Sequence, residues 1–300
     1  MLIQDRFEKC TFSNSERVVI DFILNQKIAI QNMTTKEIGE ATYTAPSTLI
    51  RIAHKMGFQG WNELKSAYLQ ELKYLETHFC HVDANIPFQE NDTIMSIASK
   101  IAMLKKESID DTLSLITHDD LQKAIQIIRK ASSIHLFAVS NNLLITQEFK
   151  HNMSRIQKHV EICSLQSEIL FQATLAAPST CAIIVSYSGE TDILNKCILA
   201  LKQNQIPIIA ITNIGDNTTA RLSDCVLKIC TREKLYSKIA TYSTDSAIEY
   251  LLDVIYSCVF ALDYQHNFDL RIKTSQIIEA GRYSTVELMK EDHFNQKGDS

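Results

Sequence analysis

The sequence predicts an all-helical domain followed by an α/β domain with a five-stranded parallel sheet flanked by helices. A chain of 300 residues exceeds what one hydrophobic core usually serves. The first 77 residues place their apolar positions at helical spacing. From about residue 132, short apolar runs alternate with amphipathic stretches, as in buried parallel strands joined by helices. We expect a helical domain at 1–77, a linker at 78–91, the α/β domain at 92–265, and a C-terminal helix with a polar tail at 266–300.

Composition excludes several classes of protein. With only 7 glycines, the chain contains neither of the glycine-rich nucleotide-binding motifs G-x-G-x-x-G and G-x-x-x-x-G-K-[ST]. The net charge is −5, so any DNA binding must be local to one part of the chain. The 8 cysteines form no C-x-x-C pair and lie mostly in apolar surroundings, as reduced cytosolic cysteines do. The beginning of the chain lacks signal-peptide character, and the most apolar stretch, 250–262, is too short to span a membrane. We therefore expect a cytoplasmic protein without membrane association.

No metal site, cofactor or catalytic residue stands out. His78, Cys80 and His81 lie close together, but three ligands without a matching pair make a metal site improbable. An isomerase would need a positioned acid–base pair, and nothing in the spacing selects one from the acids and histidines near the predicted strands. These candidates are Glu168, Glu190, Glu249 and His151.

The helical part contains two short helices with a tight connection. Thr34 to Glu37 forms a capping box, so a helix begins there and runs through Ala41. Pro46 suits the first position of a second helix, which runs from Ser47 to Met56. Gly57 supplies a left-handed stop. This arrangement is a helix-turn-helix, whose second helix can lie in the major groove of DNA.

The second helix has one apolar face and one polar face. Helical spacing buries Leu49, Ile52, Ala53 and Met56. It leaves Ser47, Thr48, Arg51 and Lys55 outward. Residues 43–73 carry four basic side chains against two acidic ones, so this region is basic within an acidic protein. We expect Arg51 to contact a guanine edge or a phosphate, and Lys55 and Lys65 to contact the DNA backbone. The alternative is an ordinary solvated helix face.

The residues from Ser47 onward resemble the RpiR-type helix-turn-helix. Thr48, Arg51, Gly57, Phe58, Gly60, Leu64 and Lys65 fall on the family pattern S-P-A-T-V-x-R-F-x-x-x-L-G-F-x-G-F-x-E-L-K. Trp61 replaces an aromatic residue of that pattern, and Ala45 stands where the family has its N-cap serine. Alanine is a poor cap. The resemblance implies sequence-specific binding of double-stranded DNA.

The second half contains five strand-like apolar runs. They are Ile134–Val139, Val160–Cys163, Cys181–Val185, Ile206–Ile211 and Cys225–Ile229. The intervening stretches have helical periodicity. The run at 250–262 indicates a buried helix, and a last helix is expected at about 274–290.

The loop after the third run has the composition of an anion site. Ser186, Ser188 and Thr191 supply hydroxyl donors at a helix start, and Gly189 permits close approach of a phosphate. Glu190 and Asp192 would repel a phosphate unless they are aimed aside, or they can meet sugar hydroxyls. The alternative is a plain helix cap in a strand-to-helix loop.

This loop resembles the S-x-S-G-x-T loop of SIS domains, a fold that binds phosphorylated sugars. Residues 210–213 match the I-T-N stretch of that fold, and 250–256 look like its dimer-forming helix. The first-strand loop departs from the pattern, because Ser140, Asn141 and Asn142 stand in a segment without the usual glycines. The two asparagine amides can still donate to a ligand. Thr244 and Asp245 replace the usual arginine, which implies weaker phosphate binding or a different sugar.

The order of the two domains resembles the RpiR/MurR-family regulators. The resemblance implies a homodimeric or tetrameric transcription factor of carbohydrate metabolism, with an operator and a phosphorylated sugar as partners. The sugar site would comprise Ser140, Asn141, Asn142, Ser186, Ser188, Gly189, Glu190 and Thr191. Two alternatives remain: a phosphosugar isomerase with a helical appendage, or a DNA-binding protein whose pocket has lost its ligand.

Overall fold

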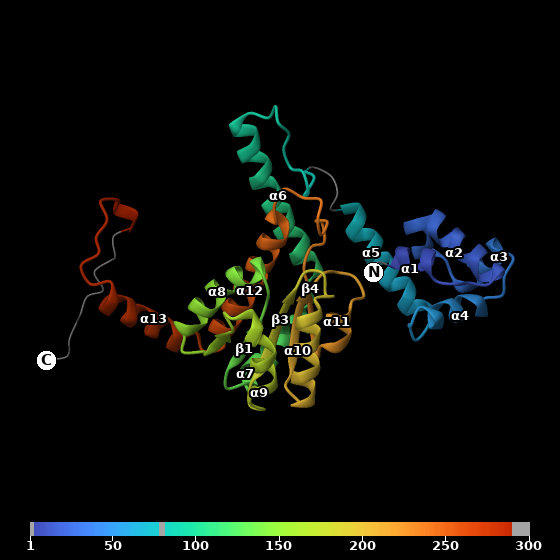
Figure 1. Cartoon of the computed structure of the whole chain (residues 1–300). Coiled ribbons are helices and arrows are strands. Elements are labelled where there is room, and N and C mark those ends of the chain that lie inside the picture. The colour runs from blue at the N-terminus through green and yellow to red at the C-terminus, as the bar shows by residue number, and fades with distance from the viewer. Residues whose placement is uncertain (1–2, 78–81, 290–300) are drawn as a thin grey trace.

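The computed structural model describes residues 3–77 and 82–289, which form a helical part and an α/β part (Figure 1). The helical part contains α1 (Ile3–Lys9), α2 (Asn14–Gln26), η1 (Lys27–Asn32), α3 (Thr35–Ala41), α4 (Ser47–Lys55) and α5 (Trp61–Thr77). Capping boxes begin α2 and α3: Ser13 pairs with Glu16, and Thr34 pairs with Glu37. The second of these confirms the predicted start of the helix-turn-helix.

The helical part has its own apolar core. Side chains from α2, α3, α4 and α5 form one buried cluster, which includes Val19, Ile23, Ile38, Leu49, Ile52, Met56 and Leu64. These residues recur at helical spacing, so each short helix buries one stripe against its neighbours. The predicted linker continues from this part: residues 82–91 form no helix or strand, and 78–81 lie outside the described residues.

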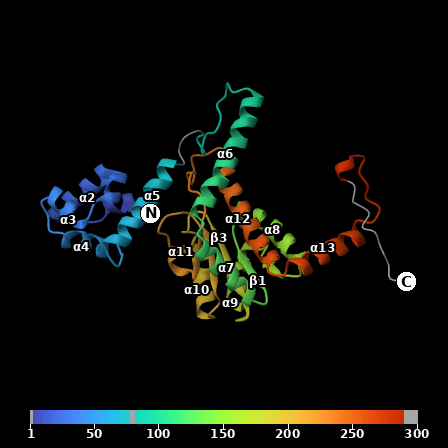
Figure 2. The same ribbon diagram turned by 180° about the vertical axis from the view of Figure 1, so that it is seen from behind.

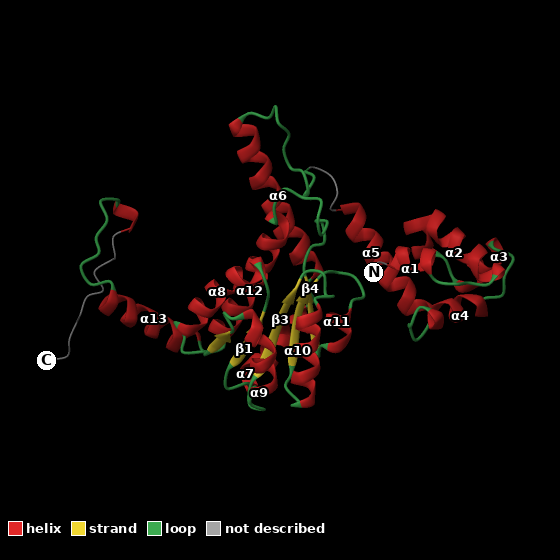
Figure 3. Ribbon diagram, in the orientation of Figure 1, coloured by secondary structure: helices red, strands yellow, loops and turns green. Residues whose placement is uncertain are grey.

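The α/β part has the predicted five-stranded parallel sheet (Figure 3). Its strands are β1 (Ile134–Phe137), β2 (Val160–Ile162), β3 (Cys181–Ser186), β4 (Ile208–Thr212) and β5 (Cys225–Lys228). Its helices are α6 (Ile94–Leu115), α7 (His118–Lys130), α8 (Asn141–Ser154), α9 (Ile169–Leu175), α10 (Asp192–Gln203), α11 (Thr218–Leu222), α12 (Tyr242–Ala261) and α13 (Tyr264–Ile278). The short η2 (Gln166–Glu168) precedes α9.

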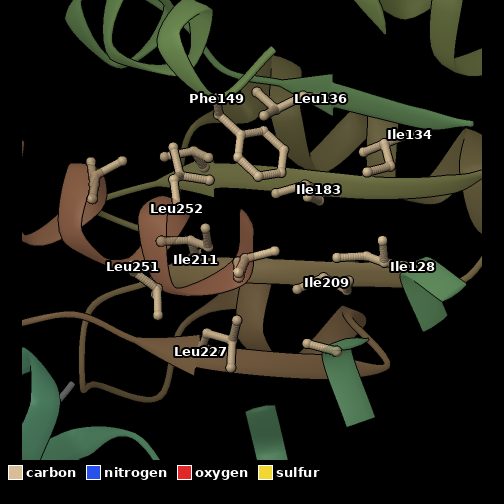
Figure 4. Packing of buried hydrophobic residues seen from close by; sticks show 14 of the residues in the cluster. Ile128, Ile134, Leu136, Phe149, Ile183, Ile209, Ile211, Leu227, Leu251 and Leu252 are labelled. Atoms are coloured by element: carbon tan, nitrogen blue, oxygen red, sulfur yellow. The ribbon is translucent and has the colours of Figure 1, made fainter. Parts of the chain in front are cut away.

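Helices cover both faces of the sheet, which explains the continuous apolar runs. On one face, α7, α8 and α12 contribute the buried side chains of Ile128, Phe149 and Leu251, among others, which pack against side chains of the sheet (Figure 4). On the other face, α9 and α10 contribute a separate buried cluster. α6 lies beside α12 (Figure 2). Every residue of β3 and β4 is buried, as expected for strands covered on both sides.

The strand order is β2-β1-β3-β4-β5. After β1 the chain crosses to one side to form β2, and from β3 onward it proceeds to the other side. The carboxyl ends of β1 and β3 therefore meet at the point where the order reverses, which is where open α/β sheets bind ligands.

The C-terminal helix differs from the prediction. α12 begins at Tyr242, and α13 follows it almost directly at 264–278, so the expected helix at 274–290 is wrong. Only the short η3 (Glu287–Met289) lies beyond, and the tail at 290–300 is outside the described residues. Tyr264 contacts Phe260 and Phe268 at ring distances of 5.5 and 6.0 Å, so an aromatic stripe continues across the break between the helices. Of the helices described, none is long and apolar enough to cross a membrane.

Candidate functional site

The turn between α3 and α4 sets the position of the second helix. A Cβ on Gly39 would come within 2.8 Å of the Thr44 carbonyl oxygen, so the close turn requires glycine there. Pro46 occupies the N-cap rather than the first helical position, and no side chain caps α4. The Thr44 hydroxyl bonds Thr42 at 2.8 Å instead. Gly57 adopts φ +82°, which confirms the predicted left-handed stop.

The exposed face of α4 is narrower than the sequence predicts. Ser47, Arg51 and Lys55 are exposed, but Thr48 is only 2% exposed, so its predicted outward position is wrong. Thr48 lies four residues before Ile52 and therefore joins the buried stripe. Its Oγ1 accepts a hydrogen bond of 3.3 Å from Arg51 Nη2. Thr48 thus orients Arg51 instead of facing outward.

Both predicted backbone-binding lysines have partners inside the helical part. Lys55 Nζ lies 2.6 Å from Oε2 of the buried Glu16 on α2. Lys65 Nζ donates to the Met33 carbonyl at 2.8 Å, and burial lowers the pKa of this lysine. Lys55 thus joins α4 to α2, and Lys65 joins α5 to the segment between η1 and α3.

Two further residues belong to this surface. Tyr43 is 98% exposed in the turn before α4 and has φ +52°, which a tyrosine rarely adopts. Arg6 of α1 donates to the Met56 carbonyl at the end of α4 and lies over the Phe58 ring. Sequence reasoning missed both: Tyr43 carries only a turn signal, and the Arg6 contact spans 50 residues.

The predicted phosphate loop follows β3 at the reversal point of the sheet. Ser186 Oγ and Thr191 Oγ1 lie 3.1 Å apart, and the Gly189 N–H donates to Ser186 Oγ at 3.2 Å. Ser188 Oγ accepts from the Glu190 N–H at 3.2 Å. The structure therefore brings the predicted donors together in one turn at the start of α10.

Gly189 is required by its surroundings. Its φ is +68°, and a Cβ would lie 2.1 Å from the Asn217 side chain. The Asn213 amide donates to the carbonyl oxygens of Tyr187 and Ser188 at 2.7 and 3.0 Å, so the predicted I-T-N stretch holds this loop. The turn is thus built against the segment after β4.

The two acids of the loop are aimed aside. Glu190 Oε1 accepts from the Thr218 N–H at 2.8 Å, at the start of α11. Burial alone would raise the pKa of Glu190, but the hydrogen bonds from Thr218 outweigh it, so the pKa is lowered and the carboxylate stays charged. Asp192 pairs with Lys196 on α10 at 2.7 Å. This removes the objection that these carboxylates repel a phosphate in the loop.

The loop after β1 is tied to the start of α12. Ser140 is exposed, with φ +53°, and its side chain does not cap α8. Asn141 Nδ2 donates to Thr241 Oγ1 at 3.1 Å and to Asp245 Oδ1 at 2.8 Å. Burial raises the pKa of Asp245. The Asn141 amide, predicted to donate to a ligand, thus already has protein acceptors, and Asn142 lies beside it, half-buried.

Two residues outside the predicted set, Glu233 and Lys238, lie beside the turn after β3 at Tyr187. Glu233, whose side chain is fully buried, accepts from the N–H groups of Ser243 and Thr244 at the start of α12. Lys238 Nζ lies 3.0 Å from Glu233 Oε2 and 5.5 Å from the centre of the Tyr187 ring. No local pattern marks these residues, because their partners are distant in sequence. Among the described residues, no cluster of acids, histidines or cysteines could hold a metal ion; His78, Cys80 and His81, where the sequence made a metal site improbable, lie outside them.

Comparisons with known proteins match both parts of the chain. Residues 2–74 match the family model of the helix-turn-helix domain, rpiR family, and residues 127–251 match that of the SIS domain. A curated relative, an uncharacterised HTH-type transcriptional regulator of Caldanaerobacter subterraneus subsp. tengcongensis, is 23% identical over 89% of this chain and 93% of its own length.

Solved structures share the fold. The Vibrio vulnificus NanR protein complexed with ManNAc-6P is 20% identical, with a TM-score of 0.58 over 94% of this chain and 99% of that one. A putative sugar-phosphate isomerase from Listeria monocytogenes is 14% identical, with a TM-score of 0.53 over 64% of this chain and 100% of that one. The fold is therefore common to regulators and enzymes.

Proposed function

We propose that this chain, which joins an rpiR-family helix-turn-helix domain to a SIS domain, is an RpiR-type transcriptional regulator in which a phosphorylated sugar in the SIS domain controls the affinity for an operator. The observation that carries the proposal is the turn from Ser186 to Thr191. It presents hydroxyls and a helix N-terminus at the reversal point of the sheet, with both neighbouring acids aimed aside.

DNA contacts come from the exposed side of α4. Arg51 is exposed and held by Thr48, so its guanidinium is oriented to read a guanine edge or bind a phosphate. Ser47, one turn before Arg51 on α4, and Tyr43, in the turn before α4, are also exposed and bind phosphates through their hydroxyls. Lys55 and Lys65 contribute positive potential near the DNA backbone while retaining their protein partners.

The ligand is a sugar phosphate. Its phosphate accepts from the hydroxyls of Ser186, Ser188 and Thr191 and from the N–H groups of Gly189 and Glu190, which exchange their bonds to Ser186 Oγ and Ser188 Oγ for the phosphate. Its sugar meets the loop at Ser140, Asn141 and Asn142, where Asn141 accepts from a sugar hydroxyl through its side-chain oxygen because its two N–H groups donate to Thr241 and Asp245. ManNAc-6P bound to NanR, a structural neighbour over 94% of this chain, supports this ligand class.

The protein regulates rather than catalyses. Isomerisation of a sugar needs a carboxylate or histidine poised at the sugar. The described carboxylates around the loop are committed to the protein: Glu190 to α11, Glu233 to α12 and Asp245 to Asn141. The likeness to isomerases keeps an enzyme as the second candidate.

The test combines DNA and ligand binding. An operator duplex selected from a random library is titrated by fluorescence anisotropy at fixed salt, with and without ManNAc-6P and a panel of hexose and pentose phosphates. Any panel member that binds also raises thermal stability, by about 2.7 kcal/mol at one hundred times its dissociation constant. We expect a 5- to 150-fold change in operator affinity with one sugar phosphate. Interconversion of panel members seen by NMR would instead establish the enzyme, and no response in either assay would establish a lost pocket.

The working form is at least a dimer joined through the SIS domain, and it acts in the cytoplasm. Two reading helices about 34 Å apart are needed to contact successive major grooves on one face of DNA. The described cysteines are all free, as in a reducing compartment.

A further inference from the structure

The loop between β5 and α12, residues 229–241, lies between the candidate sugar site and the linker to the helical part. On the site side, the Tyr187 hydroxyl donates to the Glu233 carbonyl at 2.7 Å and accepts from the Glu233 N–H at 3.0 Å. Tyr187 belongs to the phosphate turn itself. Lys238 lies over the Tyr187 ring and is only 14% exposed at its side chain.

On the other side, the same loop holds the linker through Asn85. The Ile239 N–H donates to the Asn85 carbonyl at 2.9 Å, and the Lys234 N–H donates to Asn85 Oδ1 at 2.7 Å. Asn85 Nδ2 reaches the Arg232 carbonyl at 3.4 Å. Asp83 accepts from the Asn85 N–H at 2.8 Å and so fixes the turn of the linker. The residue that contacts the linker, Ile239, directly follows Lys238.

One end of the loop is anchored. Arg232 is buried and lies 2.6 Å from both Glu107 and Asp111 on α6. The Glu233 carboxylate also accepts from three donors at the start of α12: the N–H groups of Ser243 and Thr244, and the Thr244 hydroxyl. Glu233 therefore keeps its hydrogen bonds if Lys238 leaves it.

We propose that Lys238 binds the phosphate of the effector and that its displacement from Glu233 is passed through Ile239 and Asn85 to the linker. The inference rests on the proposed function and extends it. A phosphate in the turn places a second anion beside Lys238, whose flexible stem lets the ammonium move from one anion to the other. Ligand binding thus favours a different position of residues 234–241, which supplies the differential interaction that an allosteric effect requires. Lys238 also supplies the cation that the sequence lacks at 244–245.

Two variants separate binding from transmission. Lys238→Gln removes the charge, and we expect affinity for the panel's tightest sugar phosphate, measured by calorimetry, to fall about 10- to 100-fold. Lys238→Arg retains the charge, so its affinity for the sugar phosphate should lie between those of Lys238→Gln and the wild type. Asn85→Ala leaves sugar-phosphate affinity within about twofold, but the ratio of operator affinities with and without the ligand falls at least fivefold.

Matched controls lie at the opposite end of the sheet. Lys202 donates to the Leu222 carbonyl at 3.1 Å, and Asn204 donates to that of Thr174 at 2.8 Å, so Lys202→Gln and Asn204→Ala remove similar contacts away from the site. Thermal melting verifies that each variant folds. Unchanged ligand affinity in Lys238→Gln overturns the binding role, and an unchanged operator ratio in Asn85→Ala overturns the transmission role. If the unmodified protein shows no operator response to any sugar phosphate, the proposed function itself fails.

Discussion

Thr48 and Arg51 lie one helical turn apart, and the hydroxyl of the first holds the guanidinium of the second. Because Thr48 is buried, its hydroxyl has a fixed position, and the arginine loses less rotamer freedom when it binds DNA. Thr48 matches the DNA-binding motif, but it can therefore act by positioning Arg51 instead of contacting DNA itself.

Arg51→Ala is expected to weaken operator binding about 5- to 150-fold, the range for losing one bidentate guanine contact. Thr48→Val keeps the buried shape but removes the acceptor, so a smaller loss is expected. Anisotropy titrations at fixed salt measure both, with Arg155→Ala on the α/β part as the control. Wild-type affinity in Arg51→Ala would mean that this side chain does not touch DNA.

Glu16 makes the helical part sensitive to acid. Burial alone would raise its pKa, but hydrogen bonds from Lys55 and Ser13 outweigh it and lower the pKa below its ordinary value. A lowered folded-state pKa stabilises the fold above the unfolded-state pKa, and this contribution is lost as the pH falls through the folded-state pKa.

The free energy of unfolding of the wild type should fall as the pH is lowered from about 6 to about 3, and in Glu16→Gln this fall should be smaller. Denaturant unfolding monitored by Trp61, the single tryptophan of the chain, reports on the helical part. Glu40→Gln is the matched control, because Glu40 is exposed and solvent screens its ion pair with Lys36, which has a length of 3.9 Å. An identical pH dependence in Glu16→Gln and the wild type would refute this role.

At the scale of elements, the turn between β3 and α10 depends on the segment after β4. Gly189 needs both a positive φ and the space that Asn217 leaves. Asn217 in turn caps α11 through the Ala220 N–H at 2.9 Å. The phosphate turn and α11 are therefore packed as one unit at the carboxyl edge of the sheet.

Gly189→Ala should abolish the response to sugar phosphate while operator affinity in the absence of ligand stays within about twofold, because the strain is confined to this edge of the sheet. Gly281→Ala is a matched control: Gly281 also has a positive φ, of 89°, but a Cβ there meets nothing within 4 Å. Calorimetry and anisotropy measure the two properties separately. A sugar-phosphate response that survives in Gly189→Ala would place the ligand elsewhere.

At the scale of the whole molecule, the helical and α/β parts have a direct polar contact besides the linker. Arg6 Nη1 lies 3.9 Å from Asp216, in the segment that packs on the phosphate turn. An ion pair of this length that is partly open to solvent contributes little stability. The arrangement leaves the reading helix free to be repositioned by the linker and by a second subunit.

A dimer is expected to form through the end of α12 and α13. Leu262, Tyr264 and Phe268 are 49%, 59% and 39% exposed, and α13, which carries the last two, extends away from the sheet (Figure 1). Light scattering after size exclusion should give at least twice 34.1 kDa. Tyr264→Lys combined with Phe268→Lys should lower the mass toward that of a monomer, whereas Tyr283→Lys, at a more exposed site beyond α13, should not. A monomeric wild-type protein contradicts this assembly.

Local patterns in the sequence determined both domains, the five strands, the capping box at Thr34, the stop at Gly57 and the hydroxyl-rich turn after β3. Each depends on residues within one or two turns of one another, so periodicity and capping chemistry suffice. Predictions from local patterns were wrong for the bounds of the last helix and for Thr48, which they placed outward. Packing decides which positions beside an apolar stripe are covered, and local patterns do not contain that information.

Only the tertiary structure brought the loops after β1 and β3 together, since strand order is not a local property. It also placed Lys238 beside the phosphate turn and joined Asn85 to a loop about 150 residues further along the chain. These contacts arise because a parallel sheet gathers the carboxyl ends of distant strands at one edge. The sequence by itself thus determined the hydroxyl-rich turn of the site, whereas the fold decided that Lys238 and Asn85 lie near it.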